Sequence, residues 1–168
     1  MFLTPLDFTG KYELSQGMYN TGPLLEYIEK YEKRYLLDLL GAELYKLLAL
    51  DSLGPAAPTE QRFLVIFNSL LYDYGVNVYE SGGIKEMLKG FIYFEFLRDT
   101  ISQATISGNV RPVGENSAEN STLYSTIWVR YNEGVKSYQA IQKYIFLNPE
   151  NYDYTTFNGK FKQLNYWL

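Results

Sequence analysis

Few residues of this chain are suited to catalysis or to metal binding. Its 168 residues include no cysteine and no histidine. Their absence excludes a thiolate nucleophile, a zinc site built from sulfur or imidazole ligands, and a Ser-His-Asp triad. Carboxylate acid–base chemistry and the binding of magnesium or calcium by oxygen ligands stay open. We therefore expect a protein that is not an enzyme and that has no catalytic residue, no cofactor and no metal.

Glu95 and Asp99 are the carboxylates that best fit a functional site. They stand four residues apart on a predicted helix, and this spacing places both side chains on one helix face. Arg98 lies beside them, however, and no predicted helix offers the Glu-x-x-His spacing of a bundle metal site. The pattern favours a buried or half-buried ion pair over a metal site, with Arg130 as the partner of Glu95 or Asp99.

Aromatic residues are the most unusual feature of the composition. The chain has 17 Tyr, 10 Phe and 2 Trp. Tyrosine and tryptophan combine an apolar body with a polar tip, which suits both protein cores and protein interfaces. A Tyr-rich core and a Tyr-rich interface therefore both stay open.

The charge balance argues against binding to nucleic acid. The formal net charge is −4, whereas a protein that binds DNA independently of its sequence gains its affinity from basic residues. An acidic chain could still line a passage through which DNA slides. The first residues lack a basic start and a long apolar stretch, so we expect a soluble protein without a membrane partner.

Hydrophobic periodicity predicts a mainly α chain. The predicted elements are a helix that opens at Thr21-Gly22-Pro23 and continues to about Leu48, a shorter helix capped by Thr59 that runs to Leu71, a connector over 72–81, and a long central helix from about Ile84 to Ile101. An exposed loop or short hairpin over 105–117 and a last long helix ended by Pro149 follow. Gly41 either breaks the first helix or allows another helix to approach it closely.

These elements assemble into one domain, 1–168, with the fold of a helical bundle of four to five helices. Residues 1–20 form an extended N-terminal arm, 21–148 the bundle with its inserted loop or short hairpin at 105–117, and 149–168 an aromatic C-terminal arm. Exposed aromatic clusters mark contact surfaces. The C-terminal arm therefore either folds back onto its own bundle or lies on a neighbouring subunit.

Several segments resemble the helical head–tail connector (neck, or portal adaptor, ring) proteins of tailed bacteriophages, especially those of crAss-like and other Bacteroidetes phages. The similar segments cover roughly Leu24 to Tyr152: Leu24–Ile28 with Glu32–Tyr45, the central Ile84–Phe94, the loop Thr105–Ser117, and Tyr131–Val135 followed by Tyr138. Their order and spacing carry the resemblance, because each motif alone is weakly specific.

The resemblance implies a structural protein of the virion that is made in the cytoplasm of the bacterial host and lies at the head–tail junction. Such proteins form a closed homo-oligomeric ring of about twelve copies, whose contacts are head-to-tail. The ring docks on the portal protein, extends the DNA channel without specific binding to DNA, and offers an attachment surface to the tail or to further neck proteins. The family has no catalytic residues to carry over.

Interface residues are expected in the loop and in the C-terminal arm. They are Asn109, Val110, Arg111, Val113, Tyr154, Phe157, Phe161, Tyr166 and Trp167. Two alternatives stay open: a tail-completion or tail-terminator ring protein, which differs in the position of the ring, and a small helical DNA-binding regulator. The regulator requires a basic recognition helix, and no predicted helix has one.

Overall fold

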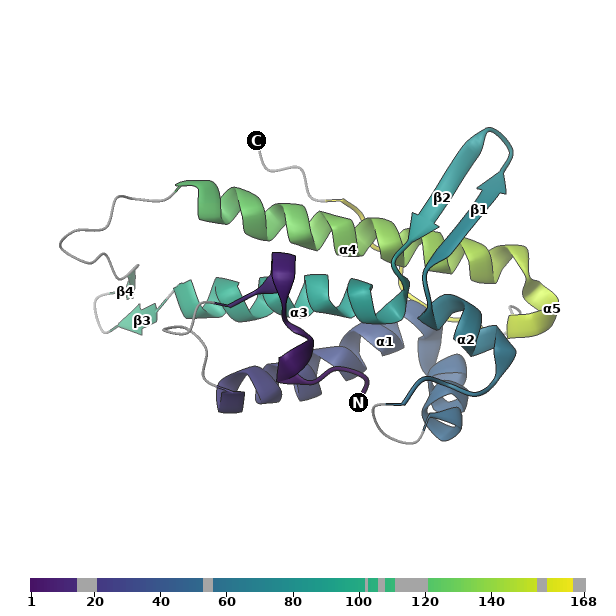
Figure 1. Ribbon diagram of the computed structural model, residues 1–168, viewed down its shortest axis with the longest axis horizontal. Helices are drawn as coiled ribbons and strands as arrows, with labels where there is room; N and C mark the ends of the chain where they lie inside the picture. Colours follow the sequence, from purple (N-terminus) through teal and green to yellow (C-terminus); the bar gives the residue numbers. More distant parts are fainter. Residues whose placement is uncertain are drawn as a thin grey trace.

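The helices and strands that follow come from a computed structural model, which describes residues 1–14, 21–52, 56–101, 103–105, 108–110, 121–153 and 157–164. Within these residues, five α-helices, two short 3-10 helices and two β-hairpins confirm a mainly α fold (Figure 1). The elements are η1 (Pro5–Asp7), η2 (Gly10–Tyr12), α1 (Thr21–Asp51), α2 (Gln61–Phe67), β1 (Leu70–Tyr74), β2 (Asn77–Ser81), α3 (Gly83–Ile101), β3 (Gln103–Thr105), β4 (Gly108–Val110), α4 (Ser121–Leu147) and α5 (Pro149–Tyr152).

Helix α3 is the centre of the bundle and lies between α1 and α4 (Figure 1). Apolar residues surround its axis on nearly every side, as the sequence predicted for a central helix. The helix approaches α4 so closely that a Cβ atom at Gly90 would lie 2.8 Å from the carbonyl oxygen of Arg130. The missing side chain therefore permits the tight packing of these two helices.

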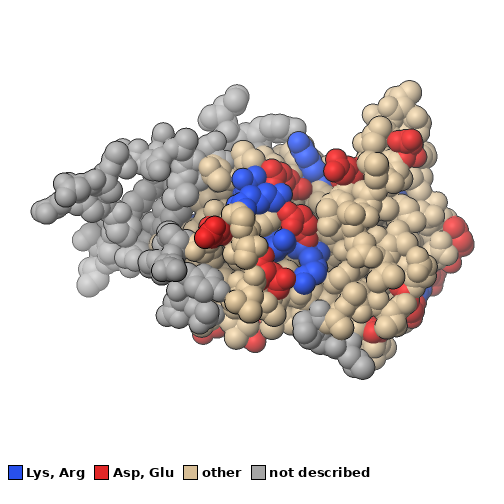
Figure 2. Space-filling model, viewed as in Figure 1, with Lys and Arg blue, Asp and Glu red and all other residues tan. Residues whose placement is uncertain are grey.

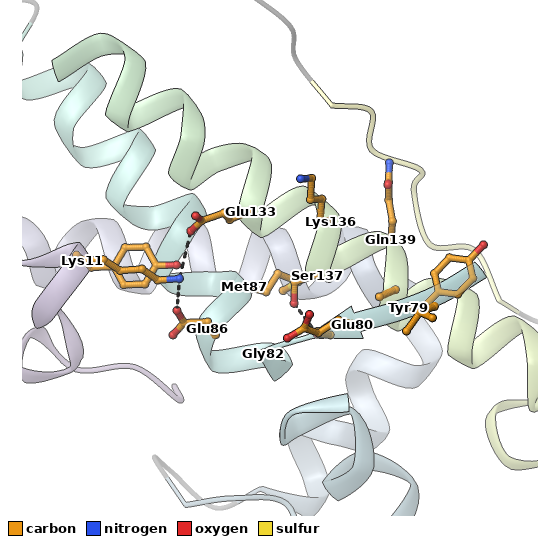
Figure 3. Close-up of a pocket in the computed structure, with 14 residues that line it drawn as sticks. Lys11, Tyr79, Glu80, Gly82, Glu86, Met87, Glu133, Lys136, Ser137 and Gln139 are labelled. Atoms are coloured by element: carbon orange, nitrogen blue, oxygen red, sulfur yellow. Dashed lines mark hydrogen bonds and ion pairs between the residues drawn. The ribbon is translucent and has the colours of Figure 1, made fainter. Parts of the chain in front are cut away.

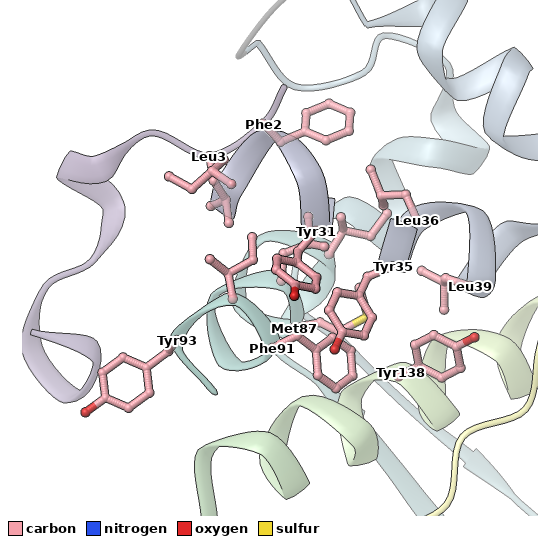
Figure 4. Close-up of a cluster of buried hydrophobic side chains, with 14 of the residues drawn as sticks. Phe2, Leu3, Tyr31, Tyr35, Leu36, Leu39, Met87, Phe91, Tyr93 and Tyr138 are labelled. Atoms are coloured by element: carbon pink, nitrogen blue, oxygen red, sulfur yellow. The ribbon is translucent and has the colours of Figure 1, made fainter. Parts of the chain in front are cut away.

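Aromatic side chains make up much of the core where α1, α3 and α4 meet. Tyr35 stacks on Phe91 with ring centroids 4.3 Å apart, and Phe91 also contacts Tyr138 and Tyr131. Figure 4 shows Tyr35, Phe91 and Tyr138 converging from the three helices. Many of the tyrosines are therefore core residues. For these residues a Tyr-rich core, rather than a Tyr-rich interface, explains the composition.

The N-terminal segment folds onto the bundle. Phe2 and Leu3 are buried with the core side chains (Figure 4), and Glu32 of α1 accepts hydrogen bonds from their amide groups at 2.7 and 3.0 Å. Phe8 and Tyr12 are also buried. The prediction of an extended N-terminal arm is therefore wrong for residues 1–14, because irregularly spaced apolar residues within and around two 3-10 turns reach the core without helical periodicity.

The described part of the C-terminal arm also lies on its own bundle. Tyr152 is buried in the core, and Phe157 and Leu164 are half-buried against it. Gln139 and Gln142 of α4 donate hydrogen bonds to the carbonyl oxygens of Lys162 and Lys160. The sequence left open whether this arm packs on its own bundle or on a neighbouring subunit. Residues 157–164 pack on their own bundle.

Residues 70–81 form an antiparallel β-hairpin, so the predicted connector over 72–81 is wrong. Leu70 pairs with Ser81 and Tyr74 with Asn77. The two-residue turn has a positive φ of 64° at Gly75, as a type II′ turn requires. The preceding helix correspondingly spans only Gln61–Phe67, and Thr59 does not cap it, since its hydroxyl and amide groups bond to Asp51.

Candidate functional site

The hairpin β1–β2 (residues 70–81), here called the projecting hairpin, extends beyond the helical body (Figure 1). Its inner face is fixed to α4. The Tyr72 hydroxyl donates to the carbonyl oxygen of Ala140 at 2.7 Å, and Tyr72 stacks on Tyr79 of β2. At the base of the hairpin, the hydroxyl groups of Ser81 and Ser137 share a hydrogen bond. These contacts give the hairpin a defined direction.

The outer face of the projecting hairpin is accessible to water and carries apolar side chains paired across the strands with acidic ones, Leu71 with Glu80 and Val78 with Asp73. Leu71 is 71% exposed, Val78 is 69% exposed, and Val76 at the turn is 99% exposed. Asp73 and Glu80 are exposed beside them. Exposed apolar side chains that gather on one element among polar residues are typical of a surface that contacts another protein.

A groove of about 740 Å³ adjoins the hairpin. Its walls come from the N-terminal segment, β2, the start of α3 and the middle of α4 (Figure 3). The residues that line it include Lys11, Tyr12, Val78, Glu80, Glu86, Met87, Glu133, Lys136 and Ser137. Because the N-terminal segment forms one wall, the groove depends on the docking of a segment that the sequence had placed in an arm.

Ion pairs neutralise the charges at one end of this groove. The Lys11 ammonium lies 2.9 Å from Glu86 and 3.1 Å from Glu133 (Figure 3). Lys89 lies 2.6 Å from Glu86. Burial by itself raises the pKa of the Glu86 carboxyl, but Lys89 and Lys11 outweigh it and lower that pKa below its usual value. Glu86 is thus held ionised at neutral pH, which suits a structural ion pair better than a general acid.

Glu95 and Asp99 take part in the ion pairs that their sequence predicted, but with a different partner. The Arg98 guanidinium lies 2.6 Å from Glu95 and 2.9 Å from Asp99. Arg130 instead pairs with Glu133 at 3.0 Å, so the prediction of Arg130 as the partner is wrong. Arg98 lies three residues after Glu95 and next to Asp99 on α3, so it reaches both carboxylates. Arg130 pairs with a carboxylate of its own helix, α4.

Tyrosine hydroxyl groups also donate hydrogen bonds to these two carboxylates. Tyr35 donates to Glu95 at 2.6 Å in the core, and Tyr27 donates to Asp99 at 2.9 Å near the surface. Burial, followed by the neighbouring Glu95 carboxylate, raises the pKa of Tyr35 far above its usual value. In the described part of the chain, no group of three or more acidic side chains is placed to hold a metal ion.

Four of the interface residues predicted from the sequence lie within the described chain: Asn109, Val110, Phe157 and Phe161. Asn109 and Val110 belong to β4, which pairs with β3. Phe157 is half-buried on the core, and Phe161 is 71% exposed. Arg111, Val113, Tyr154, Tyr166 and Trp167 lie outside the described residues.

Sequence reasoning missed Leu71, Val76 and Val78 as candidate contact residues. A Gly-Val turn between two runs rich in Leu, Tyr and Val was the available signal, since a glycine at the first turn position favours a two-residue hairpin. The partial helical periodicity that continued through Leu71 concealed this signal.

Positive and negative side chains lie close together on one face of the described chain. Figure 2 shows Lys and Arg side chains close to Asp and Glu on the face it presents. Lys85 pairs with Asp7 at 3.1 Å, next to the Lys11–Glu86 and Lys89–Glu86 pairs. A basic stripe of the kind that follows a phosphate backbone is not seen on this face of the described chain.

Comparisons of the chain with protein-family models, curated proteins and solved structures found no match. Among the helices that the structure describes, none is both long enough and apolar enough to cross a membrane.

Proposed function

We propose that this chain is a structural virion protein: a head–tail connector subunit that forms a closed ring on the portal, extends the DNA channel and offers an attachment surface for the tail. The proposal rests on the sequence resemblance together with one structural observation. That observation is the projecting hairpin, whose outer face exposes Leu71, Val76 and Val78.

A projecting apolar element fits the requirement of a ring. Head-to-tail contacts use two different surfaces of each subunit, so one surface must reach toward the neighbouring copy. The hairpin is held on α4 by Tyr72 and Ser81, so its orientation is set before assembly. Burial of Leu71, Val76 and Val78 against a neighbour would remove apolar surface from water and stabilise the contact.

The electrostatics support a passage for DNA rather than a binding site for it. The chain has a net charge of −4, and many of its described cations pair with carboxylates. A channel lined in this way would not retain the phosphate backbone. A tail-completion or tail-terminator ring would use the same features, and the two proposals differ only in where the ring sits in the particle.

The proposal is tested by cryo-electron microscopy of particles that carry this protein. We expect density for a closed ring at the portal exit, with the projecting hairpin in a contact between subunits. A ring that belongs to the head-proximal end of the tail, without contact to the portal, would favour the tail-completion or tail-terminator alternative. Absence of the protein from the particle would refute a virion role altogether.

A matched pair of variants tests the hairpin contact in particular. The double variant V76D/V78D places two carboxylates on the outer face, and we expect it to abolish ring assembly in the presence of the portal. The control is Leu50→Asp, because Leu50 is also exposed, at 77%, but lies on α1. Assembly by the hairpin variant at the level of the control would contradict a role for the hairpin.

A further inference from the structure

Residues 157–164 lie against the bend in α1. Helix α1 changes direction at Gly41 (Figure 1), where φ is 75° and ψ is 174°. Next to the bend, the amide of Lys160 donates a hydrogen bond of 2.6 Å to the carbonyl oxygen of Asp38. The side-chain oxygen of Asn158 accepts a hydrogen bond of 2.9 Å from the amide of Ala42.

Asp38 and Ala42 are the two residues that would bond to each other in a continuous helix. An α-helix joins the amide of each residue to the carbonyl oxygen four residues earlier. The bend breaks this bond between Ala42 and Asp38. The Ala42 amide donates instead to the side chain of Asn158, and the Asp38 carbonyl oxygen accepts instead from the amide of Lys160. Without these residues, both polar groups would lack their partner in the bent helix.

Two glycines allow the chains to approach this closely. A Cβ atom at Gly41 would lie 2.1 Å from the side-chain oxygen of Asn158, and one at Gly159 would lie 2.6 Å from the carbonyl oxygen of Leu39. Each contact is far shorter than real Cβ atoms permit. The bend and the segment thus fit each other only because both positions lack a side chain.

We propose that residues 157–164 act as a removable clamp that holds α1 bent, and that α1 straightens through an Ala42-to-Asp38 hydrogen bond when this clamp leaves. The bend is then a binding site for an extended peptide segment, occupied here by the chain's own residues. This inference concerns contacts within one chain and does not rest on the proposed function.

The contacts that hold the clamp on the bend can break and form again. Most are polar, and its apolar contacts come from the half-buried Phe157 and Leu164. Phe161 points into solvent, so the clamp also presents a side chain that another molecule can contact.

Leu44 and Leu48 are buried in the second half of α1 and favour the bent form. The clamp adds to their effect, so its removal shifts the balance between the bent and the straight helix.

The bend can be measured with two spin labels. The chain has no cysteine, so Glu29→Cys and Leu50→Cys introduce labels at two exposed positions on the two halves of α1. About 21 residues of straight helix would separate their backbone positions by about 32 Å. Double electron–electron resonance on the full chain should give a single shorter distance, because the bent helix brings the two labels closer together.

Two substitutions should remove the clamp from opposite sides. Gly159→Ala changes only the segment, outside every helix, and is the decisive variant. Gly41→Ala changes the bend itself, where the positive φ of 75° disfavours a side chain even without the clamp. We expect both to add a population near the distance of the straight helix. The control is Phe161→Ala, which alters an exposed side chain of the same segment and should leave the distance unchanged.

A second label pair, at Gln163 and Lys46, reports whether the clamp has left the bend. Departure of the clamp with an unchanged distance in α1 would overturn the proposal, because the core alone would then fix the bend. A clamp that stays docked in both variants would also overturn it, since the close approach at Gly41 and Gly159 would not be required. Far-UV circular dichroism verifies that the Gly159→Ala variant keeps its helices.

Discussion

At the scale of single residues, Tyr27 and Tyr35 make the same type of hydrogen bond in different surroundings. Both extend from α1 to a carboxylate on α3, but Tyr35 is buried whereas Tyr27 lies near the surface. We expect Tyr35→Phe to lower the free energy of unfolding by about 1.5–3 kcal/mol, the range for a buried bond to a charged group. Tyr27→Phe should cost less than about 1 kcal/mol because water can replace its bond.

The comparison is made by urea denaturation of both variants under the same conditions. Each substitution removes one oxygen and keeps the ring, so the stacking of Tyr35 on Phe91 is retained. Equal losses of stability for the two variants would contradict the argument that burial determines the strength of these bonds.

Asp38 is the residue at which pH should act on the clamp. Burial by itself raises the pKa of its carboxyl, but Lys160 and Lys162, at 3.0 and 3.3 Å, outweigh burial and lower the pKa below its usual 3.8. A group whose pKa is lower in the folded chain contributes stability above its unfolded pKa and loses that contribution as the pH falls through the folded pKa.

We therefore expect Asp38→Asn to lower the free energy of unfolding at pH 7 by about 1 kcal/mol, a modest value because Lys160 is largely exposed. This difference from the wild type should shrink at pH values below the folded pKa, where the native carboxyl is also neutral. Urea denaturation at both pH values measures it, with Asp73→Asn as an exposed control. A difference that is constant with pH would exclude the two ion pairs as its cause.

At the scale of elements, the projecting hairpin depends on the conformation of its turn. Gly75 has a φ of 64°, and no atom lies within 4 Å of where its Cβ would be. Gly75→Ala therefore introduces backbone strain without a steric clash, and we expect a local cost of about 1–2 kcal/mol. Hydrogen exchange should become faster for the amides of β1 and β2 and stay unchanged in α3. The control Val76→Ala keeps the glycine and should leave exchange as in the wild type.

The long helices followed from their sequences, whereas the hairpin did not. Helix α3 has apolar residues on nearly all sides, and the Gly82-Gly83 pair at its start marks a helix boundary. In the hairpin, Leu71 and Val78 are apolar but point outward. Hydrophobic periodicity assumes that apolar residues are buried in the core of their own chain. It therefore does not identify a strand whose apolar residues are exposed.

At the scale of the whole molecule, the distribution of charge predicts the behaviour toward DNA. With a net charge of −4 and paired surface cations, the chain should not retain duplex DNA even at low salt, where phosphate contacts are strongest. Fluorescence anisotropy with a labelled duplex at several salt concentrations measures this. Binding that weakens steeply with salt would favour the DNA-binding regulator over the connector.

The sequence alone determined the mainly α class, the central helix and the lack of cysteine and histidine chemistry, because composition and periodicity are local properties. It also placed Glu95 and Asp99 in an ion pair. Only the tertiary structure decided that residues 1–14 join the core, that residues 157–164 fill the bend at Gly41, and that Arg98 rather than Arg130 holds the carboxylates. These outcomes depend on contacts between residues far apart in the chain or on competition between several charged partners, and no local pattern encodes either of them.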